Sequence, residues 1–259
     1  MHRPSFATRM LLTLVVAAST ACGGAQRERD EQLRQSDFHY QLSLGHFRAR
    51  EIPQAIEELF TALRLNPDNA EAHFMLGFIF QGRRELDQAV TEYQTALRLR
   101  PGWFEVINNL GTAYLELEDW ELASQTFEPL TREPTYRTPG TAHNNLGWAL
   151  FNLHRYDEAL DHFRSAIRFQ PDLCLAYNNQ GHTFEVLGQL GEAKRALQAG
   201  LDRPACKKYA EPRYRLANLL IAEGDVDRAV ALFRECADAE PSSPFAERCR
   251  EYVDSSPGR

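Results

Sequence analysis

Residues 70–101 read AEAHFMLGFIFQGRRELDQAVTEYQTALRLRP, and this stretch decides the fold. Its apolar residues return every three to four positions, the spacing that places them on one face of an α-helix. Pro101 ends the stretch, because proline lacks a backbone donor and clashes with the preceding helical turn. The sequence therefore predicts a pair of amphipathic helices that is closed by a proline.

The same features recur along the rest of the chain, mostly at intervals of 34 residues. The Leu-Gly pair returns as Leu76-Gly77, Leu110-Gly111 and Leu146-Gly147, and the closing prolines are Pro67, Pro101, Pro171 and Pro241. The alanines are Ala55, Ala89, Ala123, Ala159, Ala193 and Ala229. This periodicity resembles the tetratricopeptide repeat, a helix–turn–helix unit of 34 residues. In that family the glycine and the alanine lie where the two helices of a repeat cross.

The resemblance implies an all-α fold, a right-handed superhelical solenoid of six tetratricopeptide repeats plus a C-terminal capping helix. We predict a repeat body over 36–253, with repeats that start near 36, 70, 104, 140, 174 and 210. Two intervals of 36 residues imply short insertions around 133–138 and 203–208. An amphipathic segment at 243–253 is expected to cover the last repeat, as terminal repeats require. Residues 254–259 are expected to form a disordered tail.

The N-terminus has the features of an export signal. A basic start precedes the apolar run MLLTLVVAA at 10–18, which is too short to span a bilayer and is typical of a signal peptide. The following residues, Ser19-Thr20-Ala21-Cys22, resemble a bacterial lipobox, with serine where leucine is usual. We therefore predict a lipoprotein signal peptide at 1–21, acylation (palmitate) at Cys22 and a flexible tether at 22–35. The alternative is ordinary cleavage, with Cys22 incidental.

The compartment follows from the same segment. Gly23, the second residue of the mature chain, resembles lipoproteins that are sorted to an outer membrane. The predicted location is the outer membrane, with the lipid-anchored protein facing the periplasm. Stable anchoring requires two or more acyl chains, which a processed lipoprotein carries.

Four further cysteines suit an exported protein, in which an even number suggests disulfides. Within the repeat model, Cys174 starts the first helix of the fifth repeat and Cys206 follows its second helix, so the two ends are neighbours. Cys236 occupies a small-residue position of the sixth repeat, and Cys249 lies on the predicted cap that packs there. We predict the pairs Cys174–Cys206 and Cys236–Cys249. Four buried free thiols remain the alternative, and a zinc site is less favoured because no Cys-x-x-Cys is present.

No motif for catalysis, nucleotide binding or metal binding is present in the sequence. The net charge is −7, whereas a nucleic-acid-binding surface usually brings a basic excess. We therefore expect no enzyme activity, no catalytic residues, no metal, no cofactor, no small-molecule substrate and no nucleic-acid partner.

A repeat solenoid offers a protein-binding surface instead, lined by the first helix of each repeat. In the first two repeats this surface is apolar and partly aromatic, which indicates an interface: Tyr40, Leu44, Phe47, Phe74, Met75 and Phe78. In the next three repeats the sixth position is asparagine, at Asn109, Asn145 and Asn179. A carboxamide both donates and accepts, so this ladder could hold the backbone of an extended peptide. The alternatives are packing between repeats for the apolar residues and bonds to neighbouring helices or water for the asparagines.

The lipobox, the short tether, the six repeats and the cysteine-bearing cap occur together here. This combination resembles the outer-membrane lipoproteins of type IV pilus biogenesis, the PilF/PilW and Tgl type. The resemblance implies a non-enzymatic pilotin, which binds the secretin subunit and promotes its membrane insertion and multimer assembly for pilus-driven motility. The alternative is a tetratricopeptide lipoprotein adaptor that docks peptidoglycan hydrolases or other envelope-assembly proteins.

Overall fold

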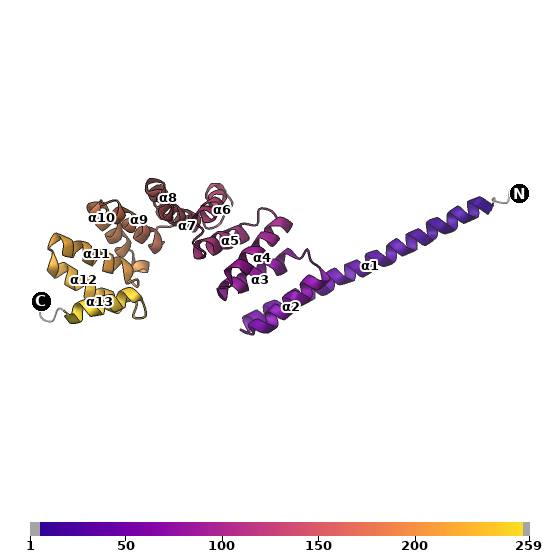
Figure 1. Cartoon of the computed structure of the whole chain (residues 1–259), viewed down its shortest axis with the longest axis horizontal. Coiled ribbons are helices and arrows are strands. Elements are labelled where there is room, and N and C mark those ends of the chain that lie inside the picture. The colour runs from indigo at the N-terminus through magenta and orange to yellow at the C-terminus, as the bar shows by residue number, and fades with distance from the viewer. Residues whose placement is uncertain (1–5, 256–259) are drawn as a thin grey trace. The chain divides into compact units, whose positions relative to one another are not determined.

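The computed structural model describes the chain from residue 6 to residue 255, with side chains from residue 26 onward. Every regular element in this part of the chain is helical (Figure 1). The elements are α1 (Phe6–Arg48), α2 (Ile52–Leu65), α3 (Ala70–Gly82), α4 (Leu86–Leu99), α5 (Phe104–Glu116), α6 (Trp120–Arg132), α7 (Pro139–Asn152), α8 (Tyr156–Phe169), α9 (Cys174–Val186), α10 (Leu190–Leu201), the short 3₁₀ helix η1 (Pro204–Cys206), α11 (Glu211–Glu223), α12 (Val226–Ala239) and α13 (Pro244–Ser255).

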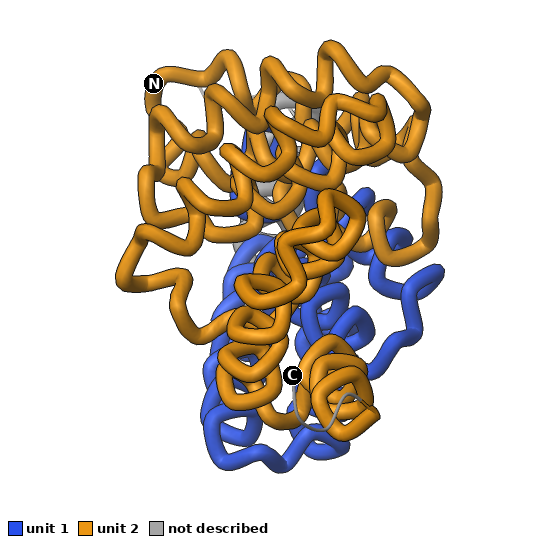
Figure 2. Tube along the Cα trace, turned by 90° about the vertical axis from the view of Figure 1, so that its left-hand side faces the viewer, with its two compact units in different colours: residues 1–106 blue, residues 107–259 orange. Residues whose placement is uncertain are grey.

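The chain divides into two compact units, residues 1–106 and residues 107–259, and the division falls inside α5 (Figure 2). In the N-terminal unit α1 packs against α2, and α3 packs against α4. In the C-terminal unit the pairs are α7 with α8, α9 with α10 and α11 with α12, and α13 packs against α12. The predicted all-α architecture of paired helices is confirmed.

The two helices of a repeat pack closest together at a glycine of the first helix. A Cβ atom built on Gly147 of α7 would lie 2.7 Å from the ring of Phe163 in α8, which is fully buried. The same arrangement places Gly77 against Tyr93 and Gly111 against Phe127. Glycine at the eighth position therefore makes room for a large side chain of the second helix, and this close packing fixes the pair.

The turn between the two helices of each repeat holds one residue in the left-handed conformation. It is the fifteenth residue of the repeat, and its φ angle lies between 59° and 84° in all six copies. Only the last two copies place glycine there; the six residues are Arg50, Arg84, Glu118, His154, Gly188 and Gly224. A non-glycine residue in this conformation costs about 1–2 kcal/mol, so helix packing imposes the turn on four residues that disfavour it.

Replacing Glu118 by glycine should therefore stabilise the C-terminal unit by about 1 kcal/mol, because glycine adopts a positive φ without steric cost. The measurement is urea unfolding of the full chain, followed by the fluorescence of its three tryptophans, of which Trp120 and Trp148 lie in the C-terminal unit. The control is Gln125→Gly on the exposed face of α6, which should destabilise by about 1 kcal/mol. Equal destabilisation by both substitutions would contradict the strain at Glu118.

Helix α1 runs without interruption through residues 22–35, which the sequence analysis expects to be a flexible tether. The physical reason is local: residues 26–35 read QRERDEQLRQ, which are good helix formers. Their side chains pair one turn apart, as Gln26 with Asp30 and Glu31 with Gln35. As a helix, residues 22–35 extend about 20 Å, less than half of the roughly 50 Å that an extended chain of this length reaches.

Two of the predictions concern parts of the chain outside the described residues. The side chain of Cys22 belongs to the undescribed part of α1, so its acylation stays a prediction. Of the expected tail, Asp254 and Ser255 belong to α13, and residues 256–259 lie outside the described part. Among the described residues, no helix combines the length and the apolar character that crossing a membrane requires.

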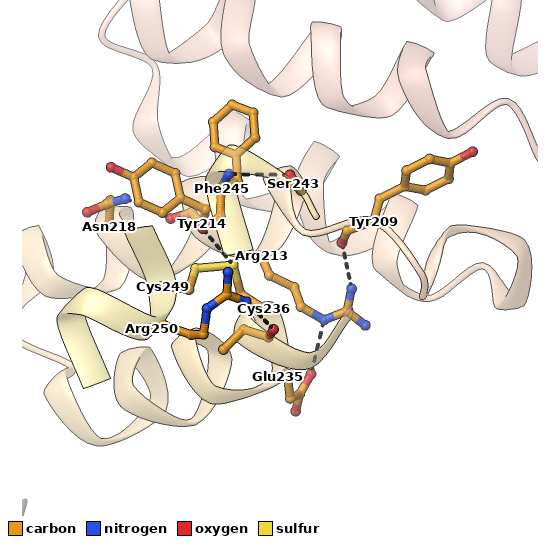
Figure 3. The surroundings of a disulfide bond; sticks show 11 residues. Tyr209, Arg213, Tyr214, Asn218, Glu235, Cys236, Ser243, Phe245, Cys249 and Arg250 are labelled. Atoms are coloured by element: carbon orange, nitrogen blue, oxygen red, sulfur yellow. Dashed lines mark hydrogen bonds and ion pairs between the residues drawn. A yellow bond between two sulfur atoms is a disulfide. The ribbon is translucent and has the colours of Figure 1, made fainter. Parts of the chain in front are cut away.

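Both disulfides are present with the predicted connectivity. Cys174, the first residue of α9, is bonded to Cys206 of η1 with their Cα atoms 5.4 Å apart. Cys236 of α12 is bonded to Cys249 of α13 with a Cα separation of 6.0 Å (Figure 3). Cys206, Cys236 and Cys249 are almost fully buried. One bond therefore ties the segment after α10 to the start of α9, and the other ties the cap α13 to α12 of the last repeat.

Candidate protein-binding surface

An exposed aromatic pair joins the first two repeats. Phe47 of α1 packs edge-to-face on Phe78 of α3, with ring centroids 5.8 Å apart. Phe78 keeps 44% of its surface exposed, and Leu44 and Phe47 are half-buried. We call Leu44, Phe47 and Phe78 the aromatic cluster. An exposed aromatic contact of this kind is typical of an interface, because aromatic side chains bury a large area at small entropic cost.

Tyr40 lies one turn before Leu44 on the same helix and has a polar surrounding. Burial raises the pKa of the Tyr40 hydroxyl, and the carboxylates of Glu71 and Glu105 raise it further. The hydroxyl therefore stays protonated at neutral pH and can donate a hydrogen bond. Tyr40 gives the edge of the aromatic cluster one polar group that could orient a partner.

Two of the predicted contact residues have a packing role. Phe74 lies against Trp103, with ring centroids 4.9 Å apart, and against Tyr93 of α4 at 6.1 Å. Met75 is buried, with 8% of its surface exposed. Phe74 therefore packs inside the second repeat and Met75 is part of the buried core, so packing, the kind of alternative that the sequence left open, describes both residues. Phe78 is the residue of this helix that a partner can reach.

A second apolar surface lies at the open end of the first repeat, and the sequence analysis did not single it out. Phe38 and Leu42 occupy the third and seventh positions of that repeat, and they are 59% and 36% exposed. The residues at these positions in later repeats are nearly fully buried, such as Ala72 and Leu76. We call Phe38 and Leu42 the end face. These positions are exposed because no helix pair of the described part of the chain covers them, and the signal in the sequence is apolar residues at positions that a neighbouring repeat normally covers.

The asparagine ladder takes part in hydrogen bonds within the chain. Asn179 donates from Nδ2 to Oδ1 of Asn144 in the preceding repeat, at 3.1 Å. Asn109 and Asn145 accept long contacts from their neighbours Asn108 and Asn144 at 3.5 and 3.4 Å. These bonds give the ladder a structural role between helices, the alternative that the sequence left open. The predicted contact with a peptide backbone stays a prediction.

The side chains from residue 26 onward include no group of three or more histidine, cysteine, aspartate or glutamate residues placed to hold a metal ion. The histidines of the repeats pair with residues of the adjoining helix instead, as His73 does with Glu92. The aromatic cluster and the end face give the N-terminal unit an exposed apolar surface, which is suited to binding a protein segment.

Four tetratricopeptide-repeat family models match the chain, at residues 50–82, 70–102, 141–173 and 178–244. The chain therefore belongs to the tetratricopeptide-repeat proteins.

One curated protein and one solved structure with similarity to this chain come from type IV pilus systems. The chain is 29% identical over 142 residues to the type IV pilus assembly protein PilF of Pseudomonas aeruginosa, an alignment that covers 54% of this chain and 56% of that protein. This chain thus spans little more than half of that relative. Among solved structures, PilW, described as a widely conserved type IV pilus biogenesis factor, has a TM-score of 0.70 at 22% identity, covering 82% of this chain and 97% of PilW.

Two further solved structures share the fold. The structure of Pseudomonas aeruginosa PilF has a TM-score of 0.67 at 22% identity and covers 88% of this chain and 99% of that chain. MamA from Desulfovibrio magneticus has a TM-score of 0.61 at 18% identity, covering 65% of this chain and 94% of that chain. At this level of identity these structures establish the tetratricopeptide fold.

Proposed function

We propose that this protein acts in type IV pilus biogenesis as a pilotin, which binds secretin subunits and promotes their membrane insertion and multimer assembly. The observation that carries the proposal is the exposed apolar surface of the first two repeats, the aromatic cluster and the end face. The sequence similarity to a type IV pilus assembly protein supports the coarser part of the proposal, a role in pilus biogenesis. The protein binds and positions its partner, and no bond is made or broken.

The predicted lipid anchor on Cys22 explains how the protein would reach the membrane into which the secretin inserts. A lipid on Cys22 holds the protein in the outer membrane, on its periplasmic side, and α1 leads directly from that anchor to the end face. Because the helical segment 22–35 extends only about 20 Å, the binding surface stays close to the membrane. Anchoring raises the local concentration of the captured subunit at the membrane into which it must insert.

The test of the partner is capture of the secretin from intact cells. A photo-crosslinking phenylalanine analogue at position 78 should give an adduct with the secretin subunit, whereas the same analogue at Phe169, which is 52% exposed in the other unit, should not. Adducts with a peptidoglycan hydrolase in place of the secretin would contradict the pilotin and favour the adaptor.

The double variant Leu42→Ala plus Phe78→Ala should reduce the captured secretin at least tenfold, because it removes exposed apolar area from both surfaces. The fold should be unaffected, since the two side chains are 36% and 44% exposed. The matched control is Val186→Ala plus Leu190→Ala, which removes a similar exposed area from the C-terminal unit. Unchanged capture by the Leu42 and Phe78 variant would overturn the assignment of the surface.

A further inference from the structure

Three positions in the first helix of a repeat are buried in the second and fourth repeats. They are the third, seventh and tenth positions, whose spacing places them in one line along the helix. In these two repeats the six side chains are at most 3% exposed. The residues are Ala72, Leu76, Ile79, Ala142, Leu146 and Ala149. Each of these lines therefore has a neighbour that covers it.

The same line is exposed on α1. Phe38 and Leu42, the end face, occupy the third and seventh positions, and the exposed Gly45 occupies the tenth. A Cβ atom built on Gly45 would meet nothing within 4 Å. Unlike α3 and α7, α1 has no helix before it among the described elements. The exposed line is therefore the surface that a preceding repeat covers elsewhere in the chain.

The element that packs there in later repeats is a helix. The second helix of one repeat packs against the first helix of the next, as α2 does against α3 and α6 against α7. The repeat array thus shows what fits this surface: an amphipathic helix with its apolar side on the line. An extended segment would leave its backbone groups unpaired against these apolar side chains.

The side chains of α1 define which helix fits. The line on α3 has a small residue at its start, Ala72, and a large one at its end, Ile79. The line on α1 has the reverse order, with Phe38 at its start and no side chain at Gly45. Because packed interfaces leave few voids, the covering helix needs a small residue opposite Phe38 and a large one opposite Gly45.

The other end of the array does not offer this helix in a second copy of the chain. The exposed residues of α13 are mostly charged, and burying them on an apolar line would be unfavourable: Glu247, Arg248, Arg250, Glu251 and Asp254. Contact between the α1 helices of two copies would occupy the end face of both. Such a pair would close the surface that the proposed function assigns to the partner, so we assign the helix to that partner.

We propose that the end face and Gly45 bind an amphipathic helix of the partner protein, which lies along α1 as α2 lies along α3. The helix carries apolar residues one turn apart and places its largest side chain over Gly45. This inference rests on the proposed function, because it names the kind of segment that the secretin presents to the first repeat. Binding of this kind extends the repeat array by one helix.

Two crosslinking positions test whether the bound segment is helical. A photo-crosslinking phenylalanine analogue replaces Phe38 in one strain and Ala49 in another, and mass spectrometry locates the secretin residues that react. Ala49, whose N–H bonds to the Gly45 carbonyl, lies three turns after Phe38, about 16 Å along the helix axis. A helix covers that distance with about eleven residues and an extended strand with about five. The expected separation on the secretin is about eleven residues.

Gly45→Leu tests whether the contact depends on shape. The variant should fold normally, because its Cβ meets nothing within 4 Å and leucine is the better helix former. The secretin adduct from position 38 should fall at least tenfold, because the leucine fills the space of the covering helix. An apolar surface without shape preference would bind as well or better. The matched control is Gly191→Leu in α10, also without a neighbour within 4 Å, which should leave the adduct unchanged.

The outcomes separate this inference from the proposed function. Secretin adducts at Phe78 without any at Phe38 or Ala49 would overturn the helix and leave the pilotin. A separation near five residues, an unchanged adduct with Gly45→Leu, or adducts between two copies of this chain at position 38 would do the same. Loss of secretin adducts at all three positions would contradict the proposed function and this inference with it.

Discussion

Removal of both disulfides should destabilise the C-terminal unit more than any other change considered for this chain. Closing the loop between Cys236 and Cys249 stabilises by about 3 kcal/mol, and closing the longer loop between Cys174 and Cys206 by about 4 kcal/mol, on the chain-entropy model. Their combined loss is comparable to the whole stability of a typical domain, about 5–15 kcal/mol. Helix α13 and the last repeat are therefore expected to open first.

Alanine is the suitable replacement, because Cys236 occupies a position where other repeats have Ala62, Ala96 and Ala166. The quadruple Cys→Ala variant at 174, 206, 236 and 249 should lose cooperative urea unfolding of its C-terminal unit, and limited proteolysis should cut within 204–255. Wild-type protein treated with dithiothreitol should behave in the same way. The N-terminal unit is the internal control, since none of its residues takes part in either disulfide. Unchanged unfolding midpoints in both samples would contradict the prediction.

Acid should also weaken the C-terminal unit, through histidines that are held neutral. Burial, followed by the charges of the neighbouring His162 and Arg168, lowers the pKa of His143 to about 4. The Nδ1 atoms of His143 and His162 are 2.9 Å apart, and there is no room for protons on both. Burial, followed by the charge of Arg215, likewise lowers the pKa of His182 to about 4.

Stability should fall with decreasing pH because the unfolded chain binds more protons than the folded chain. An unfolded histidine titrates near 6.5, so between pH 6.5 and pH 4 the unfolded chain binds protons that the folded chain excludes. The contribution of His143 is fully present above pH 6.5, and about 3 kcal/mol of it should be lost by pH 4, at about 1.4 kcal/mol per pH unit. Urea unfolding at pH 7.5, 5.5 and 4.5 measures this slope.

The chain itself offers the variant that tests this prediction. In the fourth repeat His143 lies next to His162. The first two repeats have a glutamate at the position of His162, which gives the pairs His39–Glu58 and His73–Glu92. Burial lowers the pKa of His73, but the hydrogen bonds that its ring nitrogens donate to Glu92 and to the Pro67 carbonyl outweigh this effect, so that the net shift of the pKa is upward. His162→Glu should therefore raise the pKa of His143.

In the His162→Glu variant the stabilising contribution of His143 should be present below pH 6.5 and lost as the pH rises through its raised pKa. The loss of stability on acidification should shrink or reverse. The control is His154→Asn at an exposed turn, where asparagine tolerates the positive φ; its slope should match the wild type. An unchanged slope for His162→Glu would contradict the assigned role of the pair.

The fold could be predicted from the 34-residue period because each repeat needs a small residue at the point where its two helices pack together. A glycine such as Gly147 marks the point where two helices touch, and the large side chain opposite it, Phe163, is found at the matching place in α8. The disulfide pairing was predictable for the same reason, since the repeat model places Cys174 and Cys206 at neighbouring helix ends and Cys236 at the small-residue position on which the cap with Cys249 packs. The left-handed turn residues escaped prediction because Arg50 and Glu118 give no local signal for a positive φ.

The binding surface was predictable only in part, because exposure depends on neighbours that a single repeat does not reveal. Phe78 was identified, but Phe74 turned out to pack against Trp103. Phe38 and Leu42 were missed because their positions are buried in every later repeat that carries an apolar residue there.

The proposed pilotin function requires that this protein assembles a secretin in the outer membrane. Its most direct test is a blot for heat- and detergent-resistant secretin multimers in outer membranes from cells with and without the gene. The account predicts that the multimers disappear without the gene while the secretin monomer remains, and that the wild-type gene restores them. Multimers that persist at normal amounts without the gene would contradict the account.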